Sequence, residues 1–157
     1  MLFDEEMMLL ALNEAKKAAA DGEVPVGAVI VDENSEVIAA GRNRRERTRS
    51  PLGHAEIAAI EAACAARSIH TDNWRLSDCT IYVTLEPCAM CAGAIAAARF
   101  RRLVYGAFSE GKGENGGAVS SLYNTFQLLG TKIMVRSGVL QQECTEILES
   151  FFRDLRR

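Results

Sequence analysis

Apolar and polar residues recur along the chain in patterns that predict alternating helices and strands. Apolar runs, the clearest of them rich in β-branched residues, predict five strands, at 26–31, 37–40, 80–85, 103–105 and 132–135. Helices are expected at 4–20, 54–67, 87–98 and 140–155, with a shorter one at 122–129. In the last helix, spacings of three and four residues gather one apolar stripe, formed by Leu140, Cys144, Ile147, Leu148, Phe151 and Leu155.

The order of these elements predicts one sheet with helices on both of its faces. We therefore expect an α/β protein, a three-layer α/β/α sandwich whose central mixed sheet has five strands. A polar, arginine-dense loop is expected at 42–53 and a glycine-rich loop at 106–117. The sequence contains no internal repeat, low-complexity segment or Pro/Ser-rich linker, so residues 1–157 are expected to form a single domain.

Composition and charge narrow the class of protein. Apolar residues make up 48% and charged residues 25% of the 157 residues, which is ordinary for a globular chain. The net charge of −3 excludes a chain that is basic throughout but allows a local basic patch. No apolar stretch approaches the ~20 residues of a membrane span, and the acidic N-terminus is unlike a signal peptide. We expect a cytoplasmic protein without a membrane partner.

Two short segments carry metal-binding chemistry. Five cysteines without a secretion signal favour reduced thiols or metal ligands over disulfides. Cys88 and Cys91 lie three residues apart at a predicted helix start, where they share a face and the helix N-terminus stabilises thiolates. With the imidazole of His54 they make a three-ligand zinc set, which leaves a fourth position for water, as in catalytic sites. Glu56, two residues after His54, is placed to carry protons beside that water.

Other interpretations of these residues stay open at this point. The Cys-x-x-Cys pair alone is also compatible with a redox pair or with half of a closed structural zinc site. A closed site needs a fourth ligand, but the remaining candidates have no ligand-like spacing from the pair: Cys64, Cys79, Cys144 and His70. We expect these three cysteines to pack in the core and His70 to lie on the surface.

The two segments together read His-x-Glu…Pro-Cys-x-x-Cys, the signature of zinc-dependent nucleobase deaminases. The chain resembles the cytidine and deoxycytidylate deaminase superfamily, and in particular the bacterial tRNA adenosine deaminases. The resemblance covers nearly the whole chain and rests on further segments at 22–31, 41–44, 73–76, 85–95, 104–107, 137–140 and 151–153. It implies a cytidine-deaminase-like fold and a zinc-dependent hydrolase.

The resemblance also assigns roles to single residues. It implies one zinc ion per subunit, held by His54, Cys88 and Cys91, with Glu56 as the catalytic proton shuttle. It places Asn43 against the substrate nucleoside and the backbone N–H of Ala55 against the base. It further implies a homodimer, in which small residues of the cysteine helix permit close approach; the alternative is that they pack within one subunit: Ala89, Ala92, Gly93, Ala96 and Ala97.

Several loops depart from the family pattern and leave the substrate open. Residues 50–53 read Ser-Pro-Leu-Gly where the family often has Asp-Pro-Thr-Ala, and the loop 108–121 is longer and carries two additional acids. Gly130-Thr131-Lys132 replaces a usual Asn-His pair. Five arginines crowd into eight residues directly before the histidine, and a second cluster follows later: Arg42, Arg44, Arg45, Arg47 and Arg49, then Arg99, Arg101 and Arg102. Such clusters suit RNA phosphates, although a merely solvated loop would look the same.

We therefore predict conversion of adenosine to inosine at the first anticodon position of tRNA, with the anticodon stem-loop as partner and no DNA. The alternative is a deaminase of the same fold that acts on a free nucleobase or nucleoside, such as guanine or cytosine. A non-enzymatic zinc-binding RNA module is the third possibility, and Glu56 speaks against it because metal binding alone does not require that carboxylate.

Overall fold

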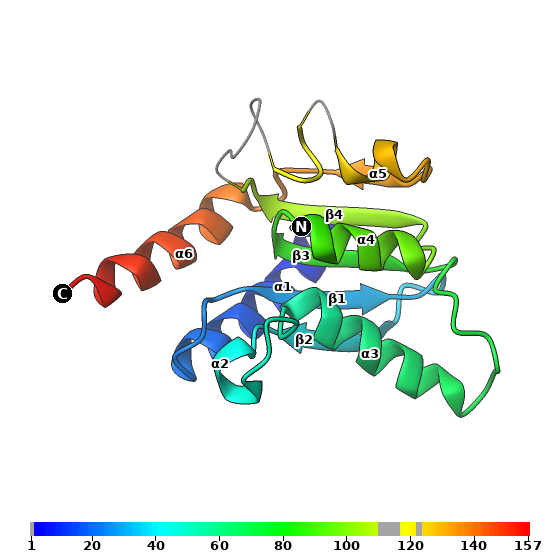
Figure 1. Ribbon diagram of the computed structural model, residues 1–157, viewed down its shortest axis with the longest axis horizontal. Helices are drawn as coiled ribbons and strands as arrows, with labels where there is room; N and C mark the ends of the chain where they lie inside the picture. Colours follow the sequence, from blue (N-terminus) through cyan, green and yellow to red (C-terminus); the bar gives the residue numbers. More distant parts are fainter. Residues whose placement is uncertain (1, 110–116, 122–123) are drawn as a thin grey trace.

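A five-stranded mixed sheet forms the centre of the structure, a computed structural model that describes residues 2–109, 117–121 and 124–157 (Figure 1). The strands follow the order β2-β1-β3-β4-β5, and β1 runs antiparallel to both of its neighbours. The pairs β3–β4 and β4–β5 are parallel. The strands are β1 (Gly27–Val31), β2 (Val37–Arg42), β3 (Thr80–Leu85), β4 (Arg102–Ala107) and β5 (Met134–Arg136).

Helices cover both faces of this sheet, as the sequence predicted (Figure 1). Alternation along β1 shows the two cores: Ala28 and Ile30 pack with residues of α3 and α4, whereas Val29 and Val31 pack with residues of α1 and α6. All five residues of β1 are buried, so the strand is covered on both faces and reads as a continuous apolar run. The helices are α1 (Phe3–Ala20), α2 (Arg45–Thr48), α3 (Ala55–Ser68), α4 (Ala89–Ala97), α5 (Thr125–Leu128) and α6 (Gln141–Leu155).

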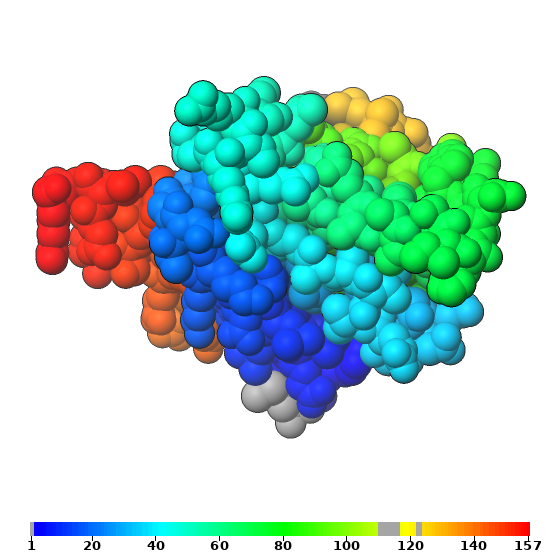
Figure 2. Space-filling view, turned by 90° about the horizontal axis from the view of Figure 1, so that it is seen from below, coloured from blue at the N-terminus to red at the C-terminus, as the bar shows by residue number. Residues whose placement is uncertain are grey.

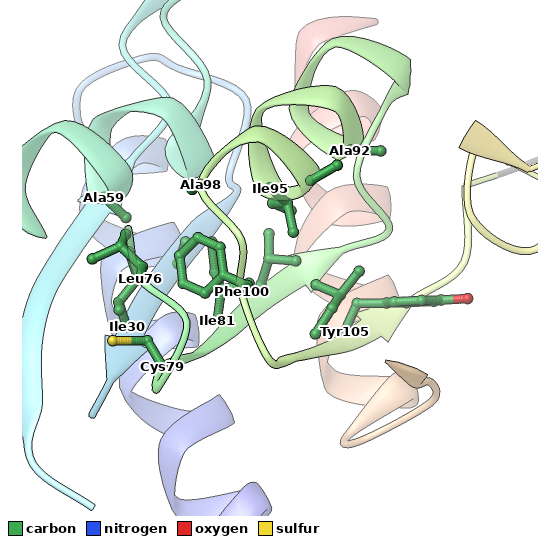
Figure 3. Close-up of a cluster of buried hydrophobic side chains, with 14 of the residues drawn as sticks. Ile30, Ala59, Leu76, Cys79, Ile81, Ala92, Ile95, Ala98, Phe100 and Tyr105 are labelled. Atoms are coloured by element: carbon green, nitrogen blue, oxygen red, sulfur yellow. The ribbon is translucent and has the colours of Figure 1, made fainter. Parts of the chain in front are cut away.

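The core on the α3 and α4 side holds one of the cysteines (Figure 3). Cys79 is fully buried beside Leu76 and Ile81, and Cys144 is fully buried in the core on the other face. Cys64 is half-buried against the first of these cores. The prediction of core packing is confirmed for Cys79 and Cys144, whereas Cys64 lies only partly buried at the edge of the core.

A buried carboxylate ties the first helix to the far half of the sheet. Asp4, at the start of α1, is 6% exposed and accepts hydrogen bonds from the guanidinium groups of Arg102 and Arg136 and from the hydroxyl of Tyr82. These partners lie on β3, β4 and β5. The hydrogen bond from Arg102 makes the largest contribution to holding the pKa of Asp4 well below its usual range. The carboxylate is therefore charged in the folded state, with its charge matched by two cations.

The boundaries of several elements differ from the prediction. The loop expected at 42–53 contains the short helix α2, and β2 continues to Arg42 because Arg42 pairs with Gly27 of β1. The helix expected from residue 87 begins at Ala89, since Cys88 is extended and serves as its N-cap. The strand β5 lies two residues later than predicted at its start. Parts of the predicted glycine-rich loop and of the helix expected at 122–129 fall outside the described residues.

Within the part of the chain that the structure describes, no helix is both long enough and apolar enough to cross a lipid bilayer.

Candidate active site

The N-terminal ends of two helices bring the predicted metal ligands together. His54 is the N-cap of α3, Cys88 is the N-cap of α4, and Cys91 lies in the first turn of α4. The Nδ1 atom of His54 lies 3.6 Å from Sγ of Cys88 and 3.5 Å from Sγ of Cys91. Candidate ligand atoms of the three residues all lie within 4.8 Å of one another.

This donor set fits a zinc ion. Sulfur and nitrogen ligands at the usual Zn–S distance of about 2.3 Å and Zn–N distance of about 2.0–2.1 Å stand about 3.6 Å apart in a tetrahedral site. The two sulfur-to-nitrogen distances in the structure agree with that separation. Among the described residues these three form the only such group, so no fourth protein ligand closes the site, and an open position is typical of catalytic zinc.

The absence of a side chain at Gly41 lets α3 pack close to β2 and so positions His54. At Gly41 of β2, a Cβ atom would lie 2.5 Å from both the carbonyl oxygen of Ala55 and the backbone nitrogen of Ala59. Only glycine lets the first turns of α3 pack this closely against the strand. The close packing of α3 on β2 fixes where His54 begins the helix.

The side chains of Cys88 and Cys91 form a hydrogen bond with each other, and the pKa values of the two thiols shift in opposite directions. The hydrogen bond with the Cys91 thiol, together with backbone N–H groups of Met90 and Cys91, lowers the pKa of Cys88 to about 5. The thiolate of Cys88 and then burial raise the pKa of Cys91 above its usual range. Cys88 is therefore the more readily ionised thiol of the pair, and a divalent metal bound there would favour loss of the proton from Cys91 as well.

Glu56 lies in the first turn of α3 and lines the same pocket as His54 and Cys88. Its side chain is 4% exposed, and this burial raises the pKa of its carboxyl group above the usual value. Glu56 is not a member of the three-residue ligand group. A carboxyl group in the same pocket as the ligand cluster, but outside the ligand set, is placed to accept and donate protons there, as general acid–base chemistry requires.

The pocket floor also contains the two residues predicted to contact substrate. Asn43 is 8% exposed; its Nδ2 donates to the carbonyl oxygen of Val24 at 3.3 Å, but its Oδ1 has no hydrogen-bond partner within the described structure. A buried acceptor without a partner is costly unless a ligand supplies the donor. Ala55 is the first residue of α3, so its backbone N–H has no acceptor within the helix. Both residues line the pocket.

Sequence reasoning missed Glu86, which is 2% exposed and lies directly before Pro87 and Cys88. Its carboxylate accepts hydrogen bonds from the backbone N–H groups of Ser109 (3.1 Å), Val119 (3.1 Å) and Ser120 (2.8 Å) and from the Ser120 hydroxyl (3.0 Å). It therefore fastens both described ends of the loop 108–121 to the segment that leads into the cysteines. Only its place between a strand and the Pro-Cys-x-x-Cys motif could have drawn attention to it.

The structure divides the small residues of α4 between two environments. Ala92 and Ala96 are buried in the core of one subunit, as the alternative interpretation had it. Ala89 and Ala97 are exposed, Gly93 is half-buried, and a Cβ atom at Gly93 would have no neighbour within 4 Å. These three residues lie four apart, on one open face of the helix.

A family model, a relative and a solved structure that match the chain all point to the same kind of enzyme. A family model described as the cytidine and deoxycytidylate deaminase zinc-binding region matches residues 1–107. The tRNA-specific adenosine deaminase of Bacillus subtilis is 45% identical to the chain, covering 100% of it and 93% of the relative. A structure from studies of A-to-I editing by tRNA:A34 deaminases at the wobble position of transfer RNA aligns with a TM-score of 0.80 at 43% identity, over 91% of this chain and 99% of that one.

A structure of guanine deaminase from Nitrosomonas europaea is also similar. It aligns with a TM-score of 0.76 at 29% identity, over 94% of this chain and 83% of that one. The same fold thus occurs in enzymes described for a tRNA and for a free nucleobase.

Proposed function

The chain belongs to the cytidine and deoxycytidylate deaminase family and is a zinc-dependent hydrolytic deaminase, and we propose that its substrate is adenosine at the first anticodon position of tRNA. The observation that carries the proposal is the buried carboxyl group of Glu56 in one pocket with the His54–Cys88–Cys91 cluster. Identity of 45% to a tRNA-specific adenosine deaminase over the whole chain supports the choice of substrate.

In this proposal His54, Cys88 and Cys91 hold zinc, and Glu56 moves the protons. Zinc bound there supplies a water whose pKa is lowered to about 7. A carboxylate oxygen of Glu56 takes one proton from the attacking water and delivers it to a ring nitrogen of adenine, and it then carries the remaining hydroxyl proton to the departing amine. A C6–O bond forms, the C6–N bond breaks, and adenosine and water become inosine and ammonia.

Other residues of the pocket bind and orient the base. The Oδ1 atom of Asn43 accepts a hydrogen bond from the nucleoside, which satisfies the acceptor that has no partner in the protein. The N–H of Ala55 donates to the base. The apolar side chains of Val24, Val26 and Leu85 line the same pocket and limit access of bulk water.

We further propose that the enzyme binds RNA as a homodimer in the cytoplasm. The open face of α4 formed by Ala89, Gly93 and Ala97 supports a close helix contact between subunits. Sedimentation of the zinc-loaded protein as a monomer at micromolar concentration would contradict the dimer.

A parallel deamination assay tests the substrate. One arm offers an anticodon stem-loop with adenosine at the first anticodon position, and the other offers free adenosine, adenine, guanine, guanosine, cytosine and cytidine. We expect inosine in the stem-loop and no comparable ammonia release from the free compounds. Ammonia from guanine alone would instead assign the enzyme to the small-substrate activity described for its structural neighbour.

A further inference from the structure

Arg45 differs from the other arginines of its loop in what surrounds it. Arg42 forms ion pairs with Glu14 and Asp21, Arg44 with Glu61, and Arg47 with Asp21. Arg45 and Arg49 form no ion pair with any described carboxylate, and Arg45 is the one arginine of the loop that lines the catalytic pocket. Three of the five arginines are therefore paired within the protein, whereas the guanidinium group at the pocket has no partner among the described carboxylates.

A buried carboxylate fixes the backbone that carries Arg45. Glu23 is 2% exposed and accepts hydrogen bonds from the backbone N–H groups of Glu46 at 2.9 Å and Arg47 at 3.3 Å. These are the second and third residues of α2, which begins at Arg45. Glu23 thus supplies the side-chain cap that the helix would otherwise lack. The segment around α2 stands out from the body in Figure 2.

Gly53, the residue before His54, packs against the same backbone segment at the start of α2. A Cβ atom at Gly53 would lie 2.8 Å from the backbone nitrogen of Arg45 and 2.9 Å from its Cα atom. The carbonyl oxygen of Gly53 also accepts a hydrogen bond from the N–H of Arg44 at 2.8 Å. The start of α2 therefore rests directly on the segment that leads into His54, which places Arg45 at a fixed position beside the ligand cluster.

The residues that line the pocket differ in burial, which distinguishes the floor of the pocket from its mouth. Glu56 and Ala55 are buried, whereas Arg45 is exposed. A base that reaches Glu56 must lie on the floor, so the ribose and its phosphates extend toward the mouth. A guanidinium group there can make two parallel hydrogen bonds to a phosphate without first breaking an ion pair to any carboxylate that the structure describes.

We propose that Arg45 binds a backbone phosphate next to the substrate nucleotide, so that the pocket selects adenosine within an RNA strand over the free nucleoside. This inference rests on the proposed function and adds a specificity-determining residue to it.

The test compares Arg45→Ala with Arg47→Ala as a matched control. Both variants remove one arginine from the same loop, but Arg47 lies outside the pocket and pairs with Asp21 at 3.8 Å. With zinc-loaded protein and the anticodon stem-loop, we expect Arg45→Ala to lower kcat/KM about ten-fold, mainly through KM. The slope of log(kcat/KM) against log[NaCl] should become shallower by about 0.7, the value for one phosphate contact on a single strand. Arg47→Ala should change kcat/KM less than two-fold, and Arg45→Lys should recover part of the loss.

Stem-loops in which one phosphate is replaced by a neutral linkage show which phosphate Arg45 contacts. Stem-loops with one methylphosphonate linkage, placed on either side of the target adenosine, remove a single phosphate charge. One of these two stem-loops should lower kcat/KM of the wild-type enzyme, but it should leave kcat/KM of Arg45→Ala unchanged, because that variant already lacks the contact. The proposal on Arg45 would be overturned if Arg45→Ala and Arg47→Ala had equal effects. It would also be overturned if the neutral linkage had the same effect on wild type and on Arg45→Ala. In either case, wild-type activity on the stem-loop would still uphold the proposed function. A wild-type enzyme that does not act on the stem-loop contradicts both.

Discussion

Glu86 accepts two hydrogen bonds from Ser120, one from its backbone N–H at 2.8 Å and one from its hydroxyl at 3.0 Å. The same carboxylate holds the backbone of Ser109, which lines the catalytic pocket. One buried carboxylate therefore holds a residue of the pocket wall and lies two positions before Cys88.

Replacing Glu86 by glutamine should destabilise the protein. The amide keeps one acceptor oxygen but turns an NH2 group toward the backbone N–H donors, which leaves buried donors without partners. We expect a loss of about 2–3 kcal/mol in the free energy of unfolding, measured by urea titration. Ser120→Ala removes only the hydroxyl bond and should cost about 1 kcal/mol. Equal stability of Glu86→Gln and wild type would show that the carboxylate does not hold the loop.

Glu56→Gln should separate metal binding from turnover. The substitution keeps the size of the side chain and leaves the three ligands in place, so zinc content should stay at one ion per subunit. Loss of the proton carrier should lower kcat by about 10²–10⁴-fold. Glu61→Gln, on the same helix but outside the pocket, is the control and should retain activity. Turnover of Glu56→Gln near the wild-type rate would disprove the proton-transfer role.

His54→Ala should reduce zinc content sharply, because it removes one of three protein ligands. The chain offers a matched control, since its other histidine, His70, is exposed and lies outside the ligand group. Zinc per subunit, measured by atomic emission after dialysis, should fall in His54→Ala and remain unchanged in His70→Ala. Full zinc occupancy in His54→Ala would rule out the ligand assignment.

The Asp4 cluster should make stability depend on pH. Because the hydrogen bond from Arg102, with smaller contributions from Tyr82 and Arg136, lowers the pKa of Asp4 in the folded state, its contribution is present above the unfolded value of about 4 and is lost as pH falls. We expect Asp4→Asn to cost about 2 kcal/mol at pH 7, less than a fully buried pair because Arg102 and Arg136 are partly exposed. The difference between wild type and Asp4→Asn, measured by urea unfolding, should narrow below pH 4. A difference that does not change with pH would contradict this account.

Local patterns were sufficient to predict the layers of the fold and the ligand cluster. The fully buried β1 and the stripe on α6 could be read from neighbouring residues, and the His-x-Glu and Pro-Cys-x-x-Cys segments each lie within one helix start. Their roles in catalysis, like the assignment of residues 1–157 to one domain, stay predictions.

Contacts between distant parts of the chain could not be predicted in this way. Glu23 caps α2 from 23 residues away, and Glu86 binds donors 23 to 34 residues later. Nothing near Glu23 in the sequence distinguishes it from a solvated acid, and the only local signal at Glu86 is its place directly before the Pro-Cys-x-x-Cys motif. The ion pairs of the arginine loop are also contacts of this kind, because carboxylates on α1 and α3 neutralise part of its charge only after folding.

The Asp4 cluster also has a consequence for how the protein is made. The ribosome releases the chain from its N-terminus, so α1 emerges first, but the cations that match the charge of Asp4 arrive with residues 102 and 136. Until then the carboxylate keeps its hydration, and α1 gains little by packing its start against β3. Most of α1 can pack on β1, which follows it directly in the chain, whereas the start of the helix gains its charged partners only when most of the sheet has been translated.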